Sequence, residues 1–162
     1  VTGLDCPRSE VSGRRLWKLF SERSPSAEAF FADTMVLNYC PLLFLEESGR
    51  NRTPDKLPPG ERERLFAPCD RALIRYLHYY RPSYVVGIGA FATGRVRQAV
   101  NAARQPDNST GASRRGSSVS VALPQVVQVL HPSPANPRAN RDWVGEATRT
   151  LVDAGIWPRT DA

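Results

Sequence analysis

Two short apolar runs limit the fold of this chain more than any other feature. Residues 84–88 (YVVGI) and 125–130 (QVVQVL) are almost continuously apolar, which is typical of parallel strands buried on both faces. Residues 90–103 between them have a helical pattern, and parallel strands need such a crossover. We therefore predict an α/β fold, a three-layer α/β/α sandwich with a mostly parallel central sheet, formed by residues 1–162 as a single domain.

The other expected elements follow from periodicity, caps and prolines. Ser9 is the expected N-cap of a first helix, Asn140 is that of the last helix, and Gly155 is the expected stop of the last helix. A further buried strand is expected at 34–37 (TMVL). Residues 104–119 are polar and low in complexity, which predicts a flexible excursion. The remaining helices are expected at about 10–23, 61–80 and 141–154, with a short second turn at 26–31 after Pro25.

Polar residues follow two of the expected strands. Parallel α/β sheets bind ligands outside the carboxyl ends of their strands, so Asn38 and His131 are the candidate site residues. His131 precedes Pro132, which holds the preceding backbone extended; alternatively, it is a capping histidine in a proline-rich turn. The Asn38 amide offers a donor and an acceptor that match the Watson–Crick edge of a pyrimidine; alternatively, it satisfies the backbone of a turn before Pro41.

Stiffness and charge both indicate a binding partner. Residues 131–137 (HPSPANP) contain three prolines, so this loop can be pressed against a partner at low entropic cost. Residues 81–162 hold 10 Lys/Arg and 5 Asp/Glu, a net charge of +5, whereas residues 1–80 hold 12 and 11, a net charge of +1. A basic half favours a polyanion such as DNA or RNA; a solubilising surface is the alternative.

The sequence argues against several classes of protein and site. No apolar run approaches the roughly 20 residues of a membrane span. Cys6, Cys40 and Cys69 are widely spaced, which argues against a disulfide framework and a zinc site and favours a reducing compartment. Residues 85–94 (VVGIGAFATG) lack the glycine spacing of a dinucleotide site. We interpret these glycines as permitting close strand–helix packing near a site, with a nucleotide-binding protein as the weaker alternative.

Four stretches of the chain carry a more specific signal: GLDCPRSEVSGRRLW (3–17), NYCPLLFLEESGRNRTP (38–54), VVGIGAFA (85–92), and HPSPANPRANRDW (131–143) through to GIWP (155–158). In this order and spacing they resemble the single-strand-selective monofunctional branch of the uracil-DNA glycosylase superfamily. HPSP at a strand end is shared across the superfamily, whereas HPSPANPRAN and CPLLFLEESGRNRTP are much more specific. The resemblance covers nearly the whole chain except 104–119.

This resemblance implies a nuclear enzyme of base-excision repair. It would hydrolyse the N-glycosidic bond of uracil and oxidised 5-substituted uracils in single- and double-stranded DNA, as a monomer, without metal, cofactor, membrane or covalent intermediate. Asn38 would hydrogen-bond the flipped uracil, and the catalytic His131 would stabilise negative charge on its O2. The following loop would enter DNA as a wedge. Its DNA-contacting residues would be Ser133, Pro134, Ala135, Asn136, Pro137, Arg138, Asn140 and Arg141.

Two features depart from the family pattern. The family carries an early Gly-Met-Asn-Pro-Gly-type motif whose Asn orients the attacking water, and this chain begins after the place where that motif would lie. We therefore expect the sheet to lack its N-terminal strand or strands and the activity of this chain to be low. A glycosylase homologue that binds DNA without cutting it is the alternative. Ala135 stands where the family often has a wedge arginine, and Arg138 and Arg141 can replace its charge but not its geometry.

Overall fold

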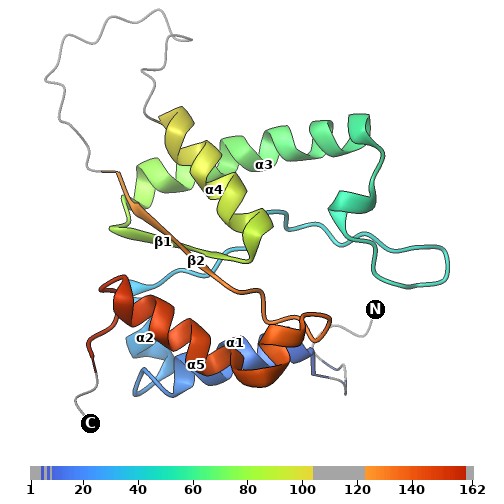
Figure 1. The fold of residues 1–162 in the computed structure, drawn as a ribbon. Helices are drawn as coiled ribbons and strands as arrows, with labels where there is room; N and C mark the ends of the chain where they lie inside the picture. The colour runs from blue at the N-terminus through green and yellow to red at the C-terminus, as the bar shows by residue number, and fades with distance from the viewer. Residues whose placement is uncertain (1–4, 6, 8, 104–122, 160–162) are drawn as a thin grey trace, which may run out of the picture. The chain divides into compact units, whose positions relative to one another are not determined.

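The computed structural model describes residues 5, 7, 9–103 and 123–159, which form two compact units (Figure 1). Unit 1 comprises Val1–Val36, Tyr84–Gly94 and Gln125–Ala162, and unit 2 comprises Leu37–Ser83 and Arg95–Pro124. The excursion predicted at 104–119 lies outside the described residues, as does Cys6. The organisation as a single domain stays a prediction, and each unit is considered by itself below.

Unit 1 is built on a parallel pair of strands. β1 (Tyr84–Ile88) pairs with β2 (Gln125–Val129), in a register that runs from Tyr84 opposite Gln125 to Ile88 opposite Val129. The helix α4 (Ala90–Ala103) begins directly after β1. The α/β class is therefore confirmed, with both strands at the predicted apolar runs. The complete three-layer sandwich stays a prediction.

The strand predicted at 34–37 is wrong. These residues follow the short helix α2 (Ala27–Asp33), and among the described residues no strand pairs with them. Met35, Val36 and Leu37 are 48%, 38% and 43% exposed. An apolar run favours extended backbone, but a strand also needs a neighbour that satisfies its peptide groups and covers its side chains. The sequence pattern reports only the first of these two conditions.

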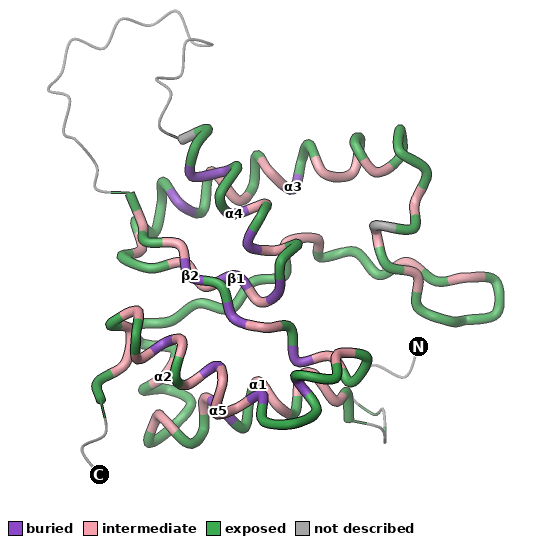
Figure 2. The backbone as a smooth tube through the Cα atoms, viewed as in Figure 1, coloured by how far each residue is buried: buried purple, intermediate pink, exposed green. Residues whose placement is uncertain are grey.

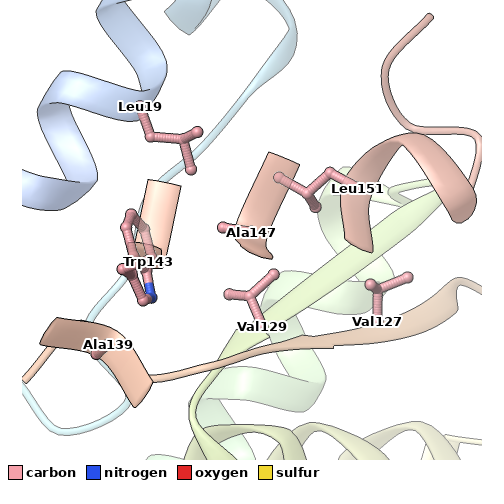
Figure 3. Close-up of a cluster of buried hydrophobic side chains, with 7 residues drawn as sticks. All are labelled: Leu19, Val127, Val129, Ala139, Trp143, Ala147 and Leu151. Carbon is pink, nitrogen blue, oxygen red and sulfur yellow. The ribbon is translucent and has the colours of Figure 1, made fainter. Parts of the chain in front are cut away.

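Two helices and β2 enclose the core of unit 1. α5 (Pro137–Asp153) packs on β2, and α1 (Val11–Ser21) packs on α5 (Figure 1). Figure 2 shows buried residues recurring along α5, as expected for an amphipathic helix. Trp143, which is 2% exposed, donates its indole N–H to the carbonyl oxygen of Leu130 at 2.6 Å. The buried cluster, drawn in Figure 3, consists of Leu19, Val127, Val129, Ala139, Trp143, Ala147 and Leu151.

The N-cap of α1 differs from the predicted one. Glu10, rather than Ser9, caps this helix, because its carboxylate accepts hydrogen bonds from the N–H groups of Ser12 at 3.0 Å and Gly13 at 2.6 Å. A carboxylate at this position satisfies two free donors and interacts favourably with the positive end of the helix dipole. The helix itself lies within the predicted range.

The last helix begins earlier than predicted, and Asn140 does not cap it. Asn136 caps α5 through the N–H of Arg138, and Asp142 has non-helical backbone in the middle of the helix. The Asp142 carboxylate accepts from the N–H of Gly145 at 2.9 Å, so it caps the second part of the helix. The predicted stop at Gly155 is confirmed: its φ is +75°, a conformation that favours glycine.

Unit 2 is built on the long helix α3 (Pro59–Tyr80), which follows an extended segment and a 3-10 turn at Pro54–Lys56. The helices predicted at 61–80 and 90–103 are thus confirmed. α3 buries Cys69 and Leu77 on one face, whereas Pro68 lies on the exposed face. A proline inside a helix leaves one carbonyl without its N–H partner, and on an exposed face water can take that place.

We expect the packing of α4 against β1 to depend on Gly87. A Cβ atom at Gly87 would lie 2.6 Å from the Cα of Thr93, which is backbone and cannot rotate away. Gly87→Ala should therefore lower the free energy of unfolding by about 1–3 kcal/mol, the usual cost of overpacking, as measured by urea denaturation. Gly94→Ala is the matched control, because a Cβ there meets nothing within 4 Å; it should leave stability unchanged or raise it by up to about 1 kcal/mol. Equal effects of the two changes would contradict this account.

Candidate functional site

His131 is held beside the end of β1 by a glycine. Gly89 has a φ of +90°, and its N–H donates to the carbonyl oxygen of Val129 at 2.8 Å, which ties the two strand ends together. A Cβ atom at Gly89 would lie 3.0 Å from the Cβ of His131. The hydroxyl of the buried Thr93 donates to the carbonyl oxygen of Gly89 at 2.8 Å and fixes this backbone. Close packing is thus confirmed for Gly87 and Gly89, whereas a Cβ atom at Gly94 would meet nothing within 4 Å; the site beside them stays a prediction.

The imidazole of His131 is exposed and has a defined hydrogen bond. Its Nδ1 atom accepts from the N–H of Ser133 at 3.2 Å. An imidazole nitrogen that accepts carries no proton, so the neutral ring carries its proton on Nε2. The side chain therefore offers one N–H donor away from its own backbone.

The loop after His131 is a closed turn rather than a flexible connection. The N–H of Asn136 donates to the carbonyl oxygen of Ser133 at 3.0 Å, and the N–H of Ala135 donates to the Ser133 hydroxyl at 3.2 Å. Asn136 then caps α5. The members of the predicted DNA-contacting set whose side chains are exposed are Pro134, Ala135, Pro137, Arg138, Asn140 and Arg141; Ser133 and Asn136 are half-buried.

Arg15 of α1 ties this loop to α5. One guanidinium nitrogen donates to the carbonyl oxygen of Pro132 at 2.9 Å, and the other donates to the side-chain oxygen of Asn140 at 2.9 Å. The Asn140 amide nitrogen in turn donates to the carbonyl oxygen of Pro134 at 2.8 Å. Pro132 and Pro134 have no backbone N–H, so this loop has few backbone donors for its own carbonyl oxygens. The side chains of Arg15 and Asn140 supply those donors instead.

Arg15 was not among the site residues predicted from the sequence. A signal was present: Arg15 lies one helical turn before Leu19, the buried residue of α1, and so on the face that turns toward the core. An arginine on a buried face needs several acceptors. The pattern predicts such acceptors, but it cannot say that they come from a loop more than a hundred residues away.

Glu10 adds negative charge near His131. Partial burial raises the pKa of Glu10, but the hydrogen bonds from Ser12 and Gly13 outweigh this effect, so the pKa of Glu10 lies below its usual value. The carboxylate therefore stays ionised at neutral pH. It lies at the N-terminus of α1, the helix that also carries Arg15.

The two arginines in the first part of α5, Arg138 and Arg141, differ in their partners. Arg138 pairs with Glu146 at 3.3 Å, and its side chain remains 71% exposed. Arg141 is exposed and makes no ion pair within the described part of the chain. Its charge is thus available to an anionic partner, whereas that of Arg138 is partly compensated.

Asn38 and His131 fall in different units. Asn38 is exposed at the beginning of unit 2, whereas His131 belongs to unit 1. Their meeting at one crevice stays a prediction. Near Asn38, the structure shows how the next residue, Tyr39, is held in place.

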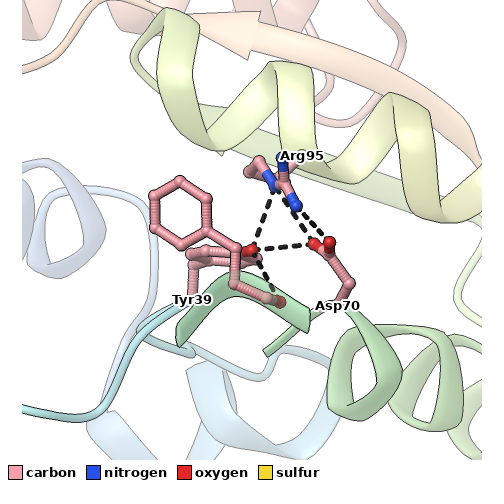
Figure 4. A network of polar contacts seen from close by, with 4 residues as sticks. Tyr39, Asp70 and Arg95 are labelled. Atoms are coloured by element: carbon pink, nitrogen blue, oxygen red, sulfur yellow. Dashed lines mark hydrogen bonds and ion pairs between the residues drawn. The ribbon is translucent and has the colours of Figure 1, made fainter. Parts of the chain in front are cut away.

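Tyr39 is held by a polar network that links α3 to α4 (Figure 4). Its hydroxyl donates to the carboxylate of Asp70 at 2.7 Å and accepts from Nε of Arg95 at 3.0 Å. Arg95 also forms an ion pair with Asp70 and lies over the rings of Tyr39 and Phe66. Burial, together with the hydrogen bond and charge of Asp70, raises the pKa of Tyr39 above its usual value. The network therefore fixes the chain directly after Asn38.

The cysteines and the acidic and histidine side chains of the described residues form neither a second nucleophile nor a metal site. Cys69 is a buried free thiol, and burial first, then the charge and hydrogen bond of the neighbouring Cys40 thiol, raises the pKa of Cys69, which makes it a poor nucleophile. Within the described residues, no group of three or more His, Cys, Asp and Glu side chains could hold a metal ion. Of the helices in those same residues, none is long and apolar enough to cross a membrane.

We expect Arg15 to determine how rigid the loop is. Arg15→Met keeps the aliphatic stem but leaves the carbonyl of Pro132 and the amide of Asn140 without their donor. It should lower the free energy of unfolding by about 1.5–3 kcal/mol and increase amide hydrogen exchange at Ala135 and Asn136. Arg14→Met is the matched control, because Arg14 is the exposed neighbour on the same helix. If both variants exchange alike at the loop, Arg15 does not hold it.

Comparison with known proteins identifies relatives of this chain. No family model matches it. It is 40% identical over 158 residues to proteins named single-strand selective monofunctional uracil-DNA glycosylase from Bos taurus, Rattus norvegicus and Mus musculus. The aligned region covers 98% of this chain and 52%, 51% and 50% of those proteins, so the chain spans about half the length of the curated relatives it matches. The resemblance predicted from the sequence is thereby confirmed: nearly the whole chain matches about half of a single-strand selective monofunctional uracil-DNA glycosylase.

Proposed function

We propose that this chain acts on DNA as a uracil-DNA glycosylase, with His131 as its catalytic donor. The single observation that carries the proposal is the seating of His131. The ring lies at the carboxyl ends of two parallel strands, its Nδ1 atom accepts from Ser133, and its free N–H is therefore on Nε2. The similarity to proteins named as uracil-DNA glycosylases supports the same reading.

The reaction needs a donor of this kind. When the bond between C1′ of the deoxyribose and N1 of uracil breaks, its electron pair moves onto the base and is shared with O2. Water then supplies hydroxide to C1′ and a proton to the base. A neutral imidazole N–H at O2 stabilises the departing anion without first having to lose its own proton. One such preorganised donor is worth about 10²–10³ in rate.

We assign substrate recognition to Asn38 and DNA contact to the loop. The Asn38 amide would pair with O4 and N3–H of a uracil turned out of the stack, which costs roughly a few kcal/mol to extrude. Ser133, Pro134, Ala135 and Asn136 would replace the base in the duplex, since a turn held by its own hydrogen bonds loses little entropy on insertion. Pro137, Arg138, Asn140 and Arg141 would hold the flanking backbone.

The same assignment covers the finer features of the substrate and setting. Uracil and 5-substituted uracils would be the bases released, and both single- and double-stranded DNA would be substrates. The chain would work as a monomer in the nucleus. Its position in the pathway would be the first step of base-excision repair, which leaves an abasic site.

A second function is favoured by one observation. The loop predicted to contact DNA is closed by the hydrogen bonds of Ser133 with Ala135 and Asn136, which would support binding whether or not a base is released. A homologue that grips DNA through the loop and releases bases slowly or not at all would have these properties. The two functions differ in base release, not in binding.

We expect His131→Leu to lower base release about 10²–10³-fold and to leave the unfolding midpoint unchanged, because the ring is exposed. The measurement is release of uracil from a single-stranded oligonucleotide under enzyme excess, followed by alkaline cleavage at the abasic site. Unchanged release would remove His131 from the mechanism. No release by the unmodified chain, together with salt-dependent binding of the same strand, would favour the second function.

We expect Arg141 to contribute more to DNA affinity than Arg138, since Glu146 already compensates Arg138 in part. Arg141→Gln should lower the slope of log K against log salt concentration for duplex DNA by about 0.9, the value of one phosphate contact. Arg138→Gln should lower it by less. Slopes that match the unmodified protein in both variants would rule out Arg138 and Arg141 as phosphate contacts.

A further inference from the structure

The C-terminal half of α3 carries a second surface suited to a polyanion. Two adjacent columns of side chains run along this helix at four-residue spacing: Arg71, Arg75 and Tyr79 in one, and Ala72, Tyr76 and Tyr80 in the other. An open groove of about 440 Å³ is lined by Pro68, Arg71, Ala72, Arg75 and Tyr76. We call the five residues Arg71, Arg75, Tyr76, Tyr79 and Tyr80 the α3 stripe.

The tyrosines of the α3 stripe are exposed but ordered by each other. Tyr76, Tyr79 and Tyr80 are 42%, 80% and 52% exposed. The rings of Tyr76 and Tyr80 stack with centroids 6.3 Å apart, and Tyr79 meets the Tyr80 ring edge-on at 4.9 Å. Three mutually supported rings form a platform that loses little side-chain freedom when a planar group stacks on it.

The charge around these rings has one sign. From 71 to 81 the sequence RALIRYLHYYR holds three arginines and one histidine and neither Asp nor Glu. The carboxylate just before this stretch, Asp70, is paired with Arg95 and Tyr39. Arg71 and Arg75 form no ion pair within the parts of the chain that the structure describes. Their positive charge is therefore uncompensated.

We propose that the α3 stripe binds a single strand of nucleic acid. Arg71 and Arg75 contact phosphates, and Tyr79 with its neighbours stacks on unpaired bases. Arginine suits phosphate because its planar fork matches the oxygens, and base stacking on exposed aromatic rings needs bases that are not already paired. Ala72 is the one aliphatic residue in the two columns, so the surface is a poor match for a lipid bilayer or for an apolar helix of a partner.

This surface does not depend on the proposed base excision. It uses neither His131 nor Asn38, and it would hold a strand that contains no uracil. If the chain is a glycosylase, the α3 stripe adds affinity for single-stranded substrate. If the chain only binds DNA, the stripe is part of how it binds.

The test compares single and paired strands that lack uracil. Fluorescence anisotropy of the whole chain with a 20-nucleotide oligo(dT), and with a duplex of that length, gives both affinities. Tyr79→Ala should weaken single-strand binding about tenfold (about 1.4 kcal/mol) and duplex binding less than twofold. Tyr79→Phe keeps the ring and should bind like the unmodified chain. Because Tyr79 is mostly exposed, an unchanged unfolding curve verifies that each variant is folded.

A charge test uses a matched arginine. Arg71→Gln with Arg75→Gln should lower the slope of log K against log salt concentration for the single strand by about 1.4, at about 0.7 for each phosphate. Arg97→Gln, an exposed arginine on α4, should lower it by clearly less than half of that.

The outcomes separate this proposal from the proposed function. Equal weakening of single-strand and duplex binding by Tyr79→Ala, or no weakening of either, overturns the α3 stripe and leaves base excision untouched. Loss of base release in His131→Leu with unchanged oligo(dT) affinity supports both. If Tyr79→Ala instead abolishes self-association or binding to anionic vesicles and leaves the strand affinity intact, the surface serves a protein or a membrane and the proposal is wrong.

Discussion

The close approach of backbone at the carboxyl ends of β1 and β2 is the constraint on which the rest of unit 1 depends. Because Gly87 has no Cβ atom, Thr93 can pack directly against the strand, and because Gly89 has none, the side chain of His131 can pack against its backbone. Any Cβ atom at these two positions would occupy the space that α4 and the histidine use. These two glycines therefore determine three features together: the parallel pairing of β1 and β2, the start of α4 and the position of the candidate catalytic ring.

The conformation of the loop after His131 is determined by hydrogen bonds to its backbone polar groups. Prolines remove donors, and the carbonyl oxygens of Pro132 and Pro134 accept instead from the side chains of Arg15 and Asn140, which lie on two different helices. A loop held by several such hydrogen bonds moves little, and a reactive group needs such support to stay within a few tenths of an ångström of its working position. The same contacts bind α1 to α5, so stability and site geometry depend on the same side chains.

The sequence predicted the local elements well and their partners poorly. The apolar runs at β1 and β2 and the periodicity of α3 were sufficient, because burial on both faces or on one stripe leaves a direct pattern. TMVL had the pattern of a strand but not the neighbour, and Asn140 had the chemistry of a cap but is engaged by Arg15 instead. In both cases the sequence indicated the intrinsic preference of the residues correctly, but it did not identify the groups with which they interact.

By itself the sequence determined the α/β class, the two strands, the position of His131 at a strand end and the resemblance to uracil-DNA glycosylases. The fold features depend on short-range patterns along the chain, and the resemblance depends on motifs that the chain shares with that family. Only the tertiary structure decided that Arg15 holds the loop, that Nδ1 of His131 accepts from Ser133, and that Tyr39 is fixed by Asp70 and Arg95. These are pairings across 117, 31 or 56 residues, or depend on the local path of the backbone. No pattern along the chain encodes them, because each donor has many possible acceptors until the core has formed.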